Sequence, residues 1–330
     1  GLINLTIDQV ADVKLRLDKY LYKTIGGYSR TQIQSWIKSG FVLVNDVAVK
    51  VSYALELHDL ISVQVPEGDN NGPELIAQKM NLEILHEDES IAVINKPAGL
   101  VVHPGVGNRD GTLVNGLMYY FNSLSDINGG ARPGIVHRLD AGTSGVMVVA
   151  KTNQAHVSLA DQFQDRQVKK EYAALTWGKW LEREGVIDQA IKRKRQDPTV
   201  FAVQDQGKPA TTRFQLVKQF RHMAQVNFFP KTGRTHQIRV HAAWLGHPVF
   251  GDEKYGGGLV KAKGFIPELK RHYGHAMQEF NRHALHAEKL EFRHPVTGNS
   301  EIFQATLPRE FINLKESIAT LDDQNQENHY

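Results

Sequence analysis

A candidate catalytic carboxylate stands in residues 134–151 (GIVHRLDAGTSGVMVVAK), where charged side chains come directly before a turn of small residues and an apolar run. The apolar run is typical of a buried strand, and a turn beside such a strand is a usual place to present reactive groups. Asp140 could act there as a base or a nucleophile, with Arg138 facing the same groove. The alternative is that Asp140 only caps the turn by accepting hydrogen bonds from backbone amides.

A second candidate segment, residues 231–241 (KTGRTHQIRVH), is rich in arginine and histidine, and its alternation predicts a strand. One face would carry Arg234, His236, Ile238 and Val240, and the other Thr235, Gln237, Arg239 and His241. Guanidinium groups make paired hydrogen bonds to phosphate or carboxylate, which favours an anion contact. No metal site is expected here, because His236 and His241 would lie on opposite faces and no carboxylate stands at ligand spacing.

Four further histidines lie close together near Arg271 and Arg282, at His272, His275, His283 and His286. A zinc site is the alternative, but this spacing is more typical of a solvated basic surface that faces RNA or has no special role. Residues 255–258 (YGGG) are expected to form a flexible surface turn, because neither a dinucleotide-binding nor a P-loop glycine motif is present.

The composition narrows the chemistry that these groups could do. The sequence contains no cysteine, which excludes disulfides, thiolate nucleophiles and cysteine-ligated metals. The net charge is only +3, but lysine and arginine gather in residues 14–50, 192–195 and 261–271, which favours a nucleic-acid partner. No run of eighteen apolar residues and no secretory signal is seen, so we expect a soluble, cytoplasmic protein without a membrane contact.

The first part of the chain predicts a small separate unit. Apolar residues at helical spacing fall in two runs, within residues 15–21 and 33–37, separated by Gly26 and Gly27. Alternating apolar residues then follow at 42–49, around Asn45 and Asp46, and at 60–65, which predicts a small sheet with a tight turn. We place a first domain at residues 1–65 and a linker at 66–81, where Pro, Gly, Asn and Asp accumulate.

The remainder predicts an α+β domain at residues 82–316 with a polar tail at 317–330. With 41% apolar residues in a chain of 330, a second and larger core is expected. Short β-rich segments outnumber helical ones, which favours a central, largely antiparallel mixed sheet flanked by helices. Strands are expected at 91–94, 145–150, 172–177, 224–229 and 237–240, and helices at 113–121, 156–166 and 240–245.

Four ordered motifs give the chain a resemblance to the large-subunit rRNA pseudouridine synthase family. They are VINKPAGLVVHPG (93–105), GIVHRLDAGTSGVMVVAKT (134–152), KKEYAALTWG (169–178) and the segment 231–256 that begins KTGRTHQIRVH. Residues 14–65 resemble an S4 RNA-binding domain. Within the family, LVVHPGVGN and FNRHALHA look closest to the subgroup that acts on the helix-69 stem-loop of 23S rRNA. One departure is Ala141-Gly142, where that subgroup often carries charged residues.

The resemblance implies a role for each of several residues. Asp140 would be the catalytic aspartate, and Tyr172 the active-site tyrosine that stacks on the target base and is placed for proton transfer. Arg234 is our choice for the basic partner of Asp140, with Arg239 as the second candidate. Arg138 would fill the gap left by a flipped nucleotide. Further RNA contacts are expected at His137, Arg239, Arg30 and Lys38.

The implied reaction is the site-specific isomerisation of uridine to pseudouridine in structured RNA, most of all 23S rRNA or a large-subunit precursor. Nothing is added to the substrate, so we expect no cofactor and no metal, and we expect a monomer. Asp140 could attack C1′ or remove the 2′ proton, and the sequence leaves both routes open. A non-catalytic RNA-binding or ribosome-assembly factor is the alternative, and a histidine-based nuclease is a third.

Overall fold

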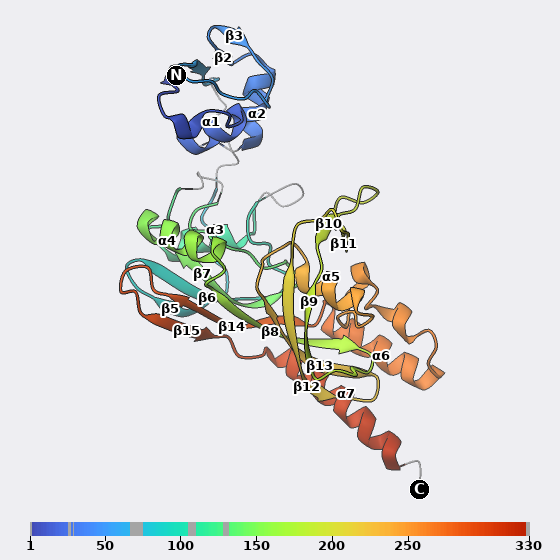
Figure 1. Cartoon of the computed structure of the whole chain (residues 1–330). Helices are drawn as coiled ribbons and strands as arrows, with labels where there is room; N and C mark the ends of the chain where they lie inside the picture. The colour runs from blue at the N-terminus through green and yellow to red at the C-terminus, as the bar shows by residue number, and fades with distance from the viewer. Residues whose placement is uncertain are drawn as a thin grey trace.

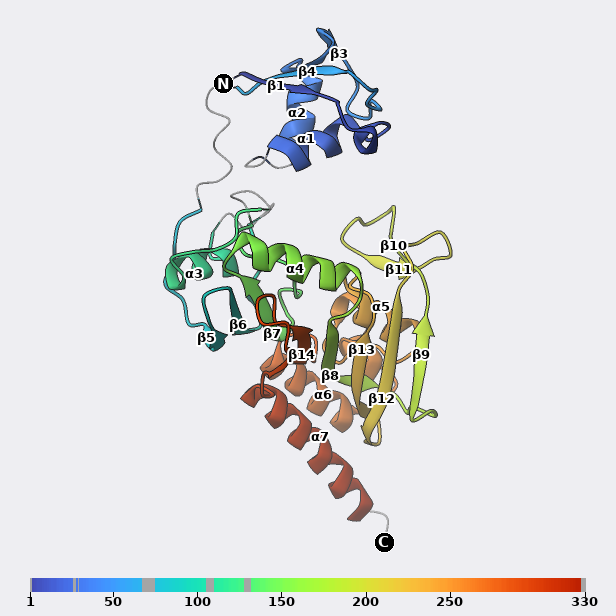
Figure 2. The same cartoon turned by 60° about the vertical axis from the view of Figure 1, so that its left-hand side comes forward.

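The computed structural model of the chain describes residues 2–25, 28, 30–66, 75–104, 110–127 and 132–327, with side chains as far as residue 321. Figures 1 and 2 show two groups of elements along the chain, a small one near the N-terminus and a large one that follows. Each has its own apolar core. The first core draws on residues from Ile7 to Val65, and the larger group contains two major clusters.

The N-terminal unit has the two helices and the tight turn that the sequence predicts, and Leu2–Thr6 adds a strand that was not predicted. Asn45 and Asp46 adopt φ values of 52° and 62°, the left-handed pair that a two-residue hairpin turn requires. The antiparallel sheet has the order β1-β4-β2-β3. Its elements are β1 (Leu2–Thr6), η1 (Val10–Asp12), α1 (Leu17–Ile25), α2 (Arg30–Lys38), β2 (Val42–Val44), β3 (Val47–Ala48) and β4 (Leu60–Gln64).

The larger unit is built on a nine-stranded sheet of order β5-β6-β7-β14-β8-β13-β12-β9, with β15 paired to β14. Within it only β7 and β14 pair in parallel, and all other pairs are antiparallel, which confirms the predicted α+β class. The strands of the sheet are β5 (Glu83–Glu87), β6 (Ile91–Lys96), β7 (Ser144–Ala150), β8 (Lys169–Trp177), β9 (Glu184–Asp188), β12 (Thr211–Gln219), β13 (Met223–Pro230), β14 (Leu285–Arg293) and β15 (Ser300–Gln304).

Helices cover different parts of this sheet. Apolar residues of α3 and α4 pack with β6 and β7 in one cluster, and those of α5, α6 and α7 pack with β8 and β13 in the other. Figures 1 and 2 agree in placing α3 and α4 beside β5 to β7, with α6 and α7 away from them near the C-terminus. The remaining elements are α3 (Leu113–Tyr120), α4 (Asn153–Gln164), β10 (Ile191–Arg193), β11 (Phe201–Val203), α5 (Gln237–Trp244), η2 (Glu253–Tyr255), η3 (Leu259–Ala262), α6 (Pro267–Phe280) and α7 (Arg309–Glu327).

Three predicted boundaries are corrected by these elements. The strand expected at 237–240 is wrong, because α5 begins at Gln237. The tail expected from 317 is wrong in its start, because α7 continues to Glu327 and buries Ile318 and Leu321. Half of the predicted linker, residues 67–74, lies outside the described ranges, whereas residues 75–81 contact α3. Asn115 donates to the Ile76 carbonyl at 2.9 Å, and Gln78 N–H donates to the Asn115 carbonyl at 2.9 Å.

Within the described ranges, no helix combines the length and the apolar character needed to cross a lipid bilayer.

Candidate active site

A pocket lies where the loop before β7 meets β8, the end of β13 and the start of α5. The loop contributes Asp140, β8 contributes Lys170 and Tyr172, and the segment 232–239 forms a long stretch of the wall. Apolar surface comes from Leu139, Ile238 and Leu285. The pocket therefore joins a carboxylate, cationic groups and a flat aromatic side chain, and it brings the predicted residues Asp140 and Tyr172 together.

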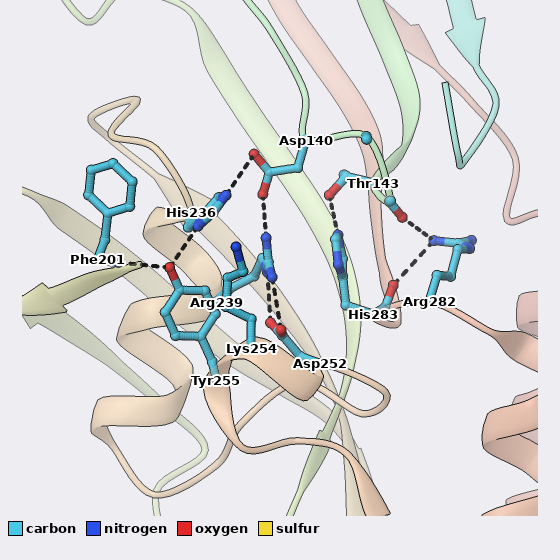
Figure 3. Close-up of polar contacts among 12 residues, drawn as sticks. Asp140, Thr143, Phe201, His236, Arg239, Asp252, Lys254, Tyr255, Arg282 and His283 are labelled. Carbon is cyan, nitrogen blue, oxygen red and sulfur yellow. Dashed lines mark hydrogen bonds and ion pairs between the residues drawn. The ribbon is translucent and has the colours of Figure 1, made fainter. Parts of the chain in front are cut away.

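Arg239 is the basic partner of Asp140. Its Nη1 donates to Asp140 Oδ2 at 3.0 Å, while Nε and Nη2 make a paired contact with Asp252 at 2.7 and 2.8 Å (Figure 3). Arg234 instead donates from Nε to the Pro209 carbonyl at 3.1 Å. The prediction that Arg234 is this partner is therefore wrong. The physical reason is that α5 replaces the expected strand, so Arg239 follows His236 by three residues and faces the same side.

The surroundings of Asp140 favour its ionised form. Burial by itself would raise the pKa of Asp140, but the positive charge of His236 when protonated and of Arg239, with the Arg239 hydrogen bond, lowers it. Burial likewise disfavours the charge on Arg239, yet its hydrogen bonds to Asp252 and the two nearby carboxylates raise its pKa. Asp140 therefore remains a carboxylate and Arg239 a cation at neutral pH.

The second oxygen of Asp140 is open. Within the described part of the chain Oδ1 accepts no hydrogen bond, and His236 Nε2 lies 3.9 Å from it. On the far side of the ring, Nδ1 lies 2.6 Å from the hydroxyl of Tyr255, which also accepts a hydrogen bond from the Phe201 N–H at 3.1 Å (Figure 3). Burial lowers the pKa of His236, so its imidazole is neutral at pH 7.

Residues distant in the sequence hold the loop that carries Asp140. Lys96 is fully buried and donates to the carbonyls of Pro97, Leu100 and Ala141 at 2.8 to 3.1 Å. On the other side, Arg282 Nη1 donates to the Gly142 carbonyl at 3.1 Å, and His283 Nε2 lies 2.7 Å from Thr143 Oγ1. The carboxylate is therefore fixed through both flanks of its loop.

Burial shifts several ionisable groups around this loop. It lowers the pKa of Lys96 to about 7 and that of Lys170 to about 8. It lowers the pKa of His283 to about 4, so this histidine is neutral beside Thr143. Burial raises the pKa of Tyr172, so the phenol on the pocket wall stays protonated.

The other predicted RNA contacts lie in different places. Arg138 is exposed at the pocket mouth, whereas His137 is turned inward: its Nε2 accepts the Val148 N–H at 3.0 Å and its ring stacks on Phe163. Arg30 and Lys38 lie on α2, away from Asp140 in the sequence and within the N-terminal unit. The structure thus brings Asp140, Tyr172, Arg138, Arg234 and Arg239 to one pocket and leaves His137 outside its lining.

Several groups of the site carried no predicted role. Asp252 and Tyr255 are two of them. The expectation of a flexible surface turn at residues 255–258 is wrong, because Gly257 and Gly258 are buried and the Trp177 indole donates to the Gly257 carbonyl at 2.7 Å. The only signal in the sequence was an acidic residue near an arginine-rich segment. His283 and His286 are also buried, with partners at Thr143 and Ser144, so the expectation of a solvated surface is wrong for both.

Among the described residues, no group of three or more histidine or acidic side chains is arranged to hold a metal ion. His241, which the sequence paired with His236 in the metal alternative, is buried between Thr212 Oγ1 and the Gln189 carbonyl, each at 2.9 Å.

Comparison with known proteins agrees with this fold and site. Residues 90–244 match the RNA pseudouridylate synthase family, and residues 15–61 match the S4 domain. The chain belongs to the RNA pseudouridine synthase family, whose members are isomerases, and carries an N-terminal S4 domain.

Individual relatives are similar over nearly the whole length. The RNA pseudouridine synthase YlyB of Bacillus subtilis is 42% identical over 92% of this chain and 94% of its own. The ribosomal large subunit pseudouridine synthase D of Xylella fastidiosa is 42% identical over 91% of this chain and 87% of its own. The structure of human RNA pseudouridylate synthase domain containing 1 aligns with a TM-score of 0.52 and 28% identity, over 69% of this chain and 84% of that one.

Proposed function

We propose that this synthase converts uridine to pseudouridine in large-subunit rRNA, with Asp140 as the catalytic carboxylate. The observation that carries the proposal is the state of Asp140 in its pocket. One oxygen is held by Arg239, the other is free of hydrogen bonds from the described residues, and Asp140 lines a pocket together with Tyr172. A carboxylate kept ionised with one open oxygen is suited to attack a carbon or remove a proton.

The isomerisation breaks the bond between uracil N1 and C1′ of the ribose. The uracil then rotates, C5 forms a bond to C1′ and loses its hydrogen as a proton, and N1 takes up a proton, so that the product is an isomer of the substrate. Asp140 Oδ1 would assist either by attacking C1′ or by removing the 2′ proton, and both routes need the ionised form that the Arg239 hydrogen bond maintains. No atom is added in either route, so the proposal includes no cofactor.

Tyr172 and Arg138 have separate parts in the proposal. The Tyr172 ring would stack on the uracil, and its protonated hydroxyl is available as a proton donor, since burial raises its pKa. Removing a base from its stack costs a few kcal/mol. The exposed guanidinium of Arg138 at the pocket mouth would occupy the space left behind and offset part of that cost.

The proposed substrate is the helix-69 stem-loop of 23S rRNA. Relatives at 37–42% identity carry the name ribosomal large subunit pseudouridine synthase D, which supports a large-subunit rRNA target. We propose that the S4 unit, residues 1–65, provides part of the affinity through Arg30 and Lys38, and that the protein acts as a cytoplasmic monomer. His137 is the weakest of the proposed RNA contacts, since its ring is engaged by Val148 and Phe163.

The test is release of tritium from a folded stem-loop that carries 5-³H-uridine, because C5 loses its hydrogen only when the isomerisation occurs. Asp140→Asn should reduce release at least about 1,000-fold, while RNA binding stays within a few-fold, because the amide cannot act as base or nucleophile. Turnover above a tenth of wild type in that variant would exclude the proposed role of Asp140. A wild-type protein that binds the RNA but releases no tritium would instead indicate a non-catalytic RNA-binding factor.

A further inference from the structure

The histidine beside the open oxygen of Asp140 has contacts that capping or packing does not account for. His236 is the N-cap residue of α5, yet its side chain makes no capping hydrogen bond to that helix. Its backbone lies in the left-handed region, at φ 57°, a conformation that residues other than glycine seldom adopt. The polar contacts of the ring lead instead to Tyr255 on one side and towards Asp140 on the other.

The contacts of the Tyr255 hydroxyl favour one tautomer of His236. The Tyr255 hydroxyl accepts the Phe201 N–H at 3.1 Å, so its own proton is free to be donated to His236 Nδ1, 2.6 Å away. A neutral imidazole that accepts at Nδ1 must carry its hydrogen on Nε2. Nε2 is the nitrogen that faces Asp140 Oδ1.

We propose that His236 is a positioning residue for the proposed catalytic carboxylate: Tyr255 fixes the imidazole so that its Nε2–H faces Oδ1, the oxygen that Arg239 leaves open. Arg239 holds Oδ2 at 3.0 Å, so the two groups approach the carboxylate from its two oxygens (Figure 3). The inference rests on the proposed function of Asp140 and adds the group that orients its reactive oxygen.

The distance fits a contact that tightens on RNA binding. At 3.9 Å the Nε2–H is too far from Oδ1 for a hydrogen bond, so it orients the carboxylate by its dipole alone. Hydrogen bonds in active sites commonly shorten in the substrate complex. The β10–β11 hairpin is tied to this chain of groups through Phe201, which pairs with Arg193 beside the connecting loop, and the Arg193 guanidinium lies 5.3 Å from the Phe201 ring.

The test uses the full chain and the tritium-release assay on the 5-³H-uridine stem-loop. His236→Ala should lower kcat by about 10- to 100-fold and change KM by less than about 3-fold, because the residue orients the reacting group and binds little of the RNA. His236→Gln returns an N–H donor at similar reach and should recover a large share of the lost rate. Gln has no useful acid or base at neutral pH, so recovery identifies the N–H as the group that matters.

Tyr255→Phe tests the second half of the inference. It should lower kcat by about 3- to 10-fold, and the double variant with His236→Ala should be no worse than His236→Ala alone, because both changes remove the same contact. His275→Ala and Tyr119→Phe, at exposed positions away from the pocket, are the matched controls and should keep wild-type kcat.

The possible results separate three claims: the role of His236, its link to Tyr255 and the proposed function of Asp140. Wild-type kcat in His236→Ala, or a His236→Gln variant as impaired as His236→Ala, would overturn the inference. Additive losses in the double variant would overturn the link through Tyr255. If His236→Ala fails to fold, the His236→Gln and Tyr255→Phe variants test the same inference. An active Asp140→Asn variant would reject the proposed function itself, whereas an inactive one with a normal His236→Ala rejects the His236 role alone.

Discussion

Asp18 in the S4 unit and Asp140 in the synthase domain are both held by arginine, but in opposite arrangements. Asp18 is fully buried and shared by two arginines: Arg30 Nη2 donates at 2.6 Å and Arg16 Nε at 3.0 Å, with Gln34 adding a bond at 2.7 Å. Asp140 instead shares one arginine, Arg239, with a second carboxylate, Asp252.

The difference lies in what each carboxylate has left to offer. Both oxygens of Asp18 accept hydrogen bonds, so its charge serves to orient two arginine side chains that are 44% and 41% exposed. Asp140 keeps Oδ1 open to a pocket. A carboxylate whose two oxygens both accept hydrogen bonds can present arginine side chains at a surface, which suits phosphate contacts. A carboxylate with one oxygen free of hydrogen bonds can still act as a base or nucleophile.

The two aspartates also differ in how their backbone is supported. Asp18 lies in the first turn of α1, where hydrogen bonds within the helix fix the chain. Asp140 lies in a loop whose position depends on Lys96, Arg282 and His283. The position of Asp140 therefore depends on side chains distant in the sequence, whereas that of Asp18 is fixed within its own helix.

Removing one arginine from each aspartate should give the largest contrast. Arg239→Gln leaves two carboxylates without their shared cation, so kcat should fall at least about 100-fold, and stability should fall by about 3–5 kcal/mol as for a broken buried pair. Arg30→Gln leaves Asp18 with Arg16 and Gln34, so kcat should not change, and the slope of log affinity against log salt should drop by about 1.

Arg234→Gln is the matched control for this comparison, because it changes a pocket arginine that does not contact Asp140. We expect its effect mainly in KM, with kcat within about 10-fold of wild type. Circular dichroism of all three variants separates lost folding from lost chemistry. Equal losses of kcat in Arg234→Gln and Arg239→Gln would contradict the assignment of Arg239 as the partner.

A smaller effect should follow from disturbing the Asp140 loop without touching any charge. A methyl group at position 142 would stand 2.8 Å from His283 Cε1, closer than side chains normally approach. Gly142→Ala should therefore displace the loop, lower kcat by about 10-fold and cost about 1–3 kcal/mol of stability by overpacking. Gly264→Ala meets no atom within 4 Å and is the control.

The comparison predicts that Gly142→Ala acts on kcat far more than on KM, because the loop carries the carboxylate and little of the RNA-binding surface. Normal kcat in Gly142→Ala, with His283 still paired to Thr143, would show that the loop tolerates movement.

The smallest effect concerns the pH dependence of stability in the S4 unit. Burial would raise the pKa of Asp18, but hydrogen bonds from Gln34, Arg30 and Arg16 lower it. The folded unit thus binds the proton less readily than the unfolded chain, in which aspartate has a pKa of about 3.9. The stabilisation is complete well above that pH and is lost as the pH falls towards the lowered folded-state pKa.

Amide hydrogen exchange in α1 and β4, compared between pH 7 and pH 4, measures this local stability within the full chain. Asp18→Asn should lower it by about 1–3 kcal/mol at pH 7, and should flatten its change with pH. Asp8→Asn makes the same change at an exposed position and serves as the control. An unchanged pH profile in Asp18→Asn would show that other carboxylates govern the unit.

Local patterns were enough to predict the N-terminal unit apart from β1, and long-range contacts explain where prediction failed. The helices at α1 and α2 and the turn at Asn45 and Asp46 depend on neighbours in sequence, and each is confirmed. Segment 237–240 holds β-branched Ile238 and Val240 at alternate positions, which favours a strand. Its polar side chains find their partners elsewhere: Gln237 contacts Thr211 and Thr212, 26 and 25 residues away.

Because this segment was predicted as a strand and is a helix, the wrong arginine was predicted as the partner of Asp140. Alternation places His236 and Arg239 on opposite faces, whereas one helical turn places them together, and both then face Asp140. Asp140 was a candidate from its own segment and Tyr172 from the resemblance alone; the structure brings both to one pocket, while their catalytic roles remain proposals. Asp252 and Tyr255 could not be assigned, because nothing within their own segment indicates the partners at Arg239 and His236.

The parallel pairing of β7 with β14 has a consequence for the nascent chain. Ser144 lies opposite His286, so the strand beside the Asp140 loop gains this neighbour only after 142 further residues have been synthesised. Arg282 and His283 arrive at the same late stage. Contacts of such high sequence separation form slowly and late in folding. A chain that ends before residue 282 would therefore contain Asp140 with its loop held by Lys96 on one flank alone, because the contacts of Arg282 and His283 on the other flank would be missing.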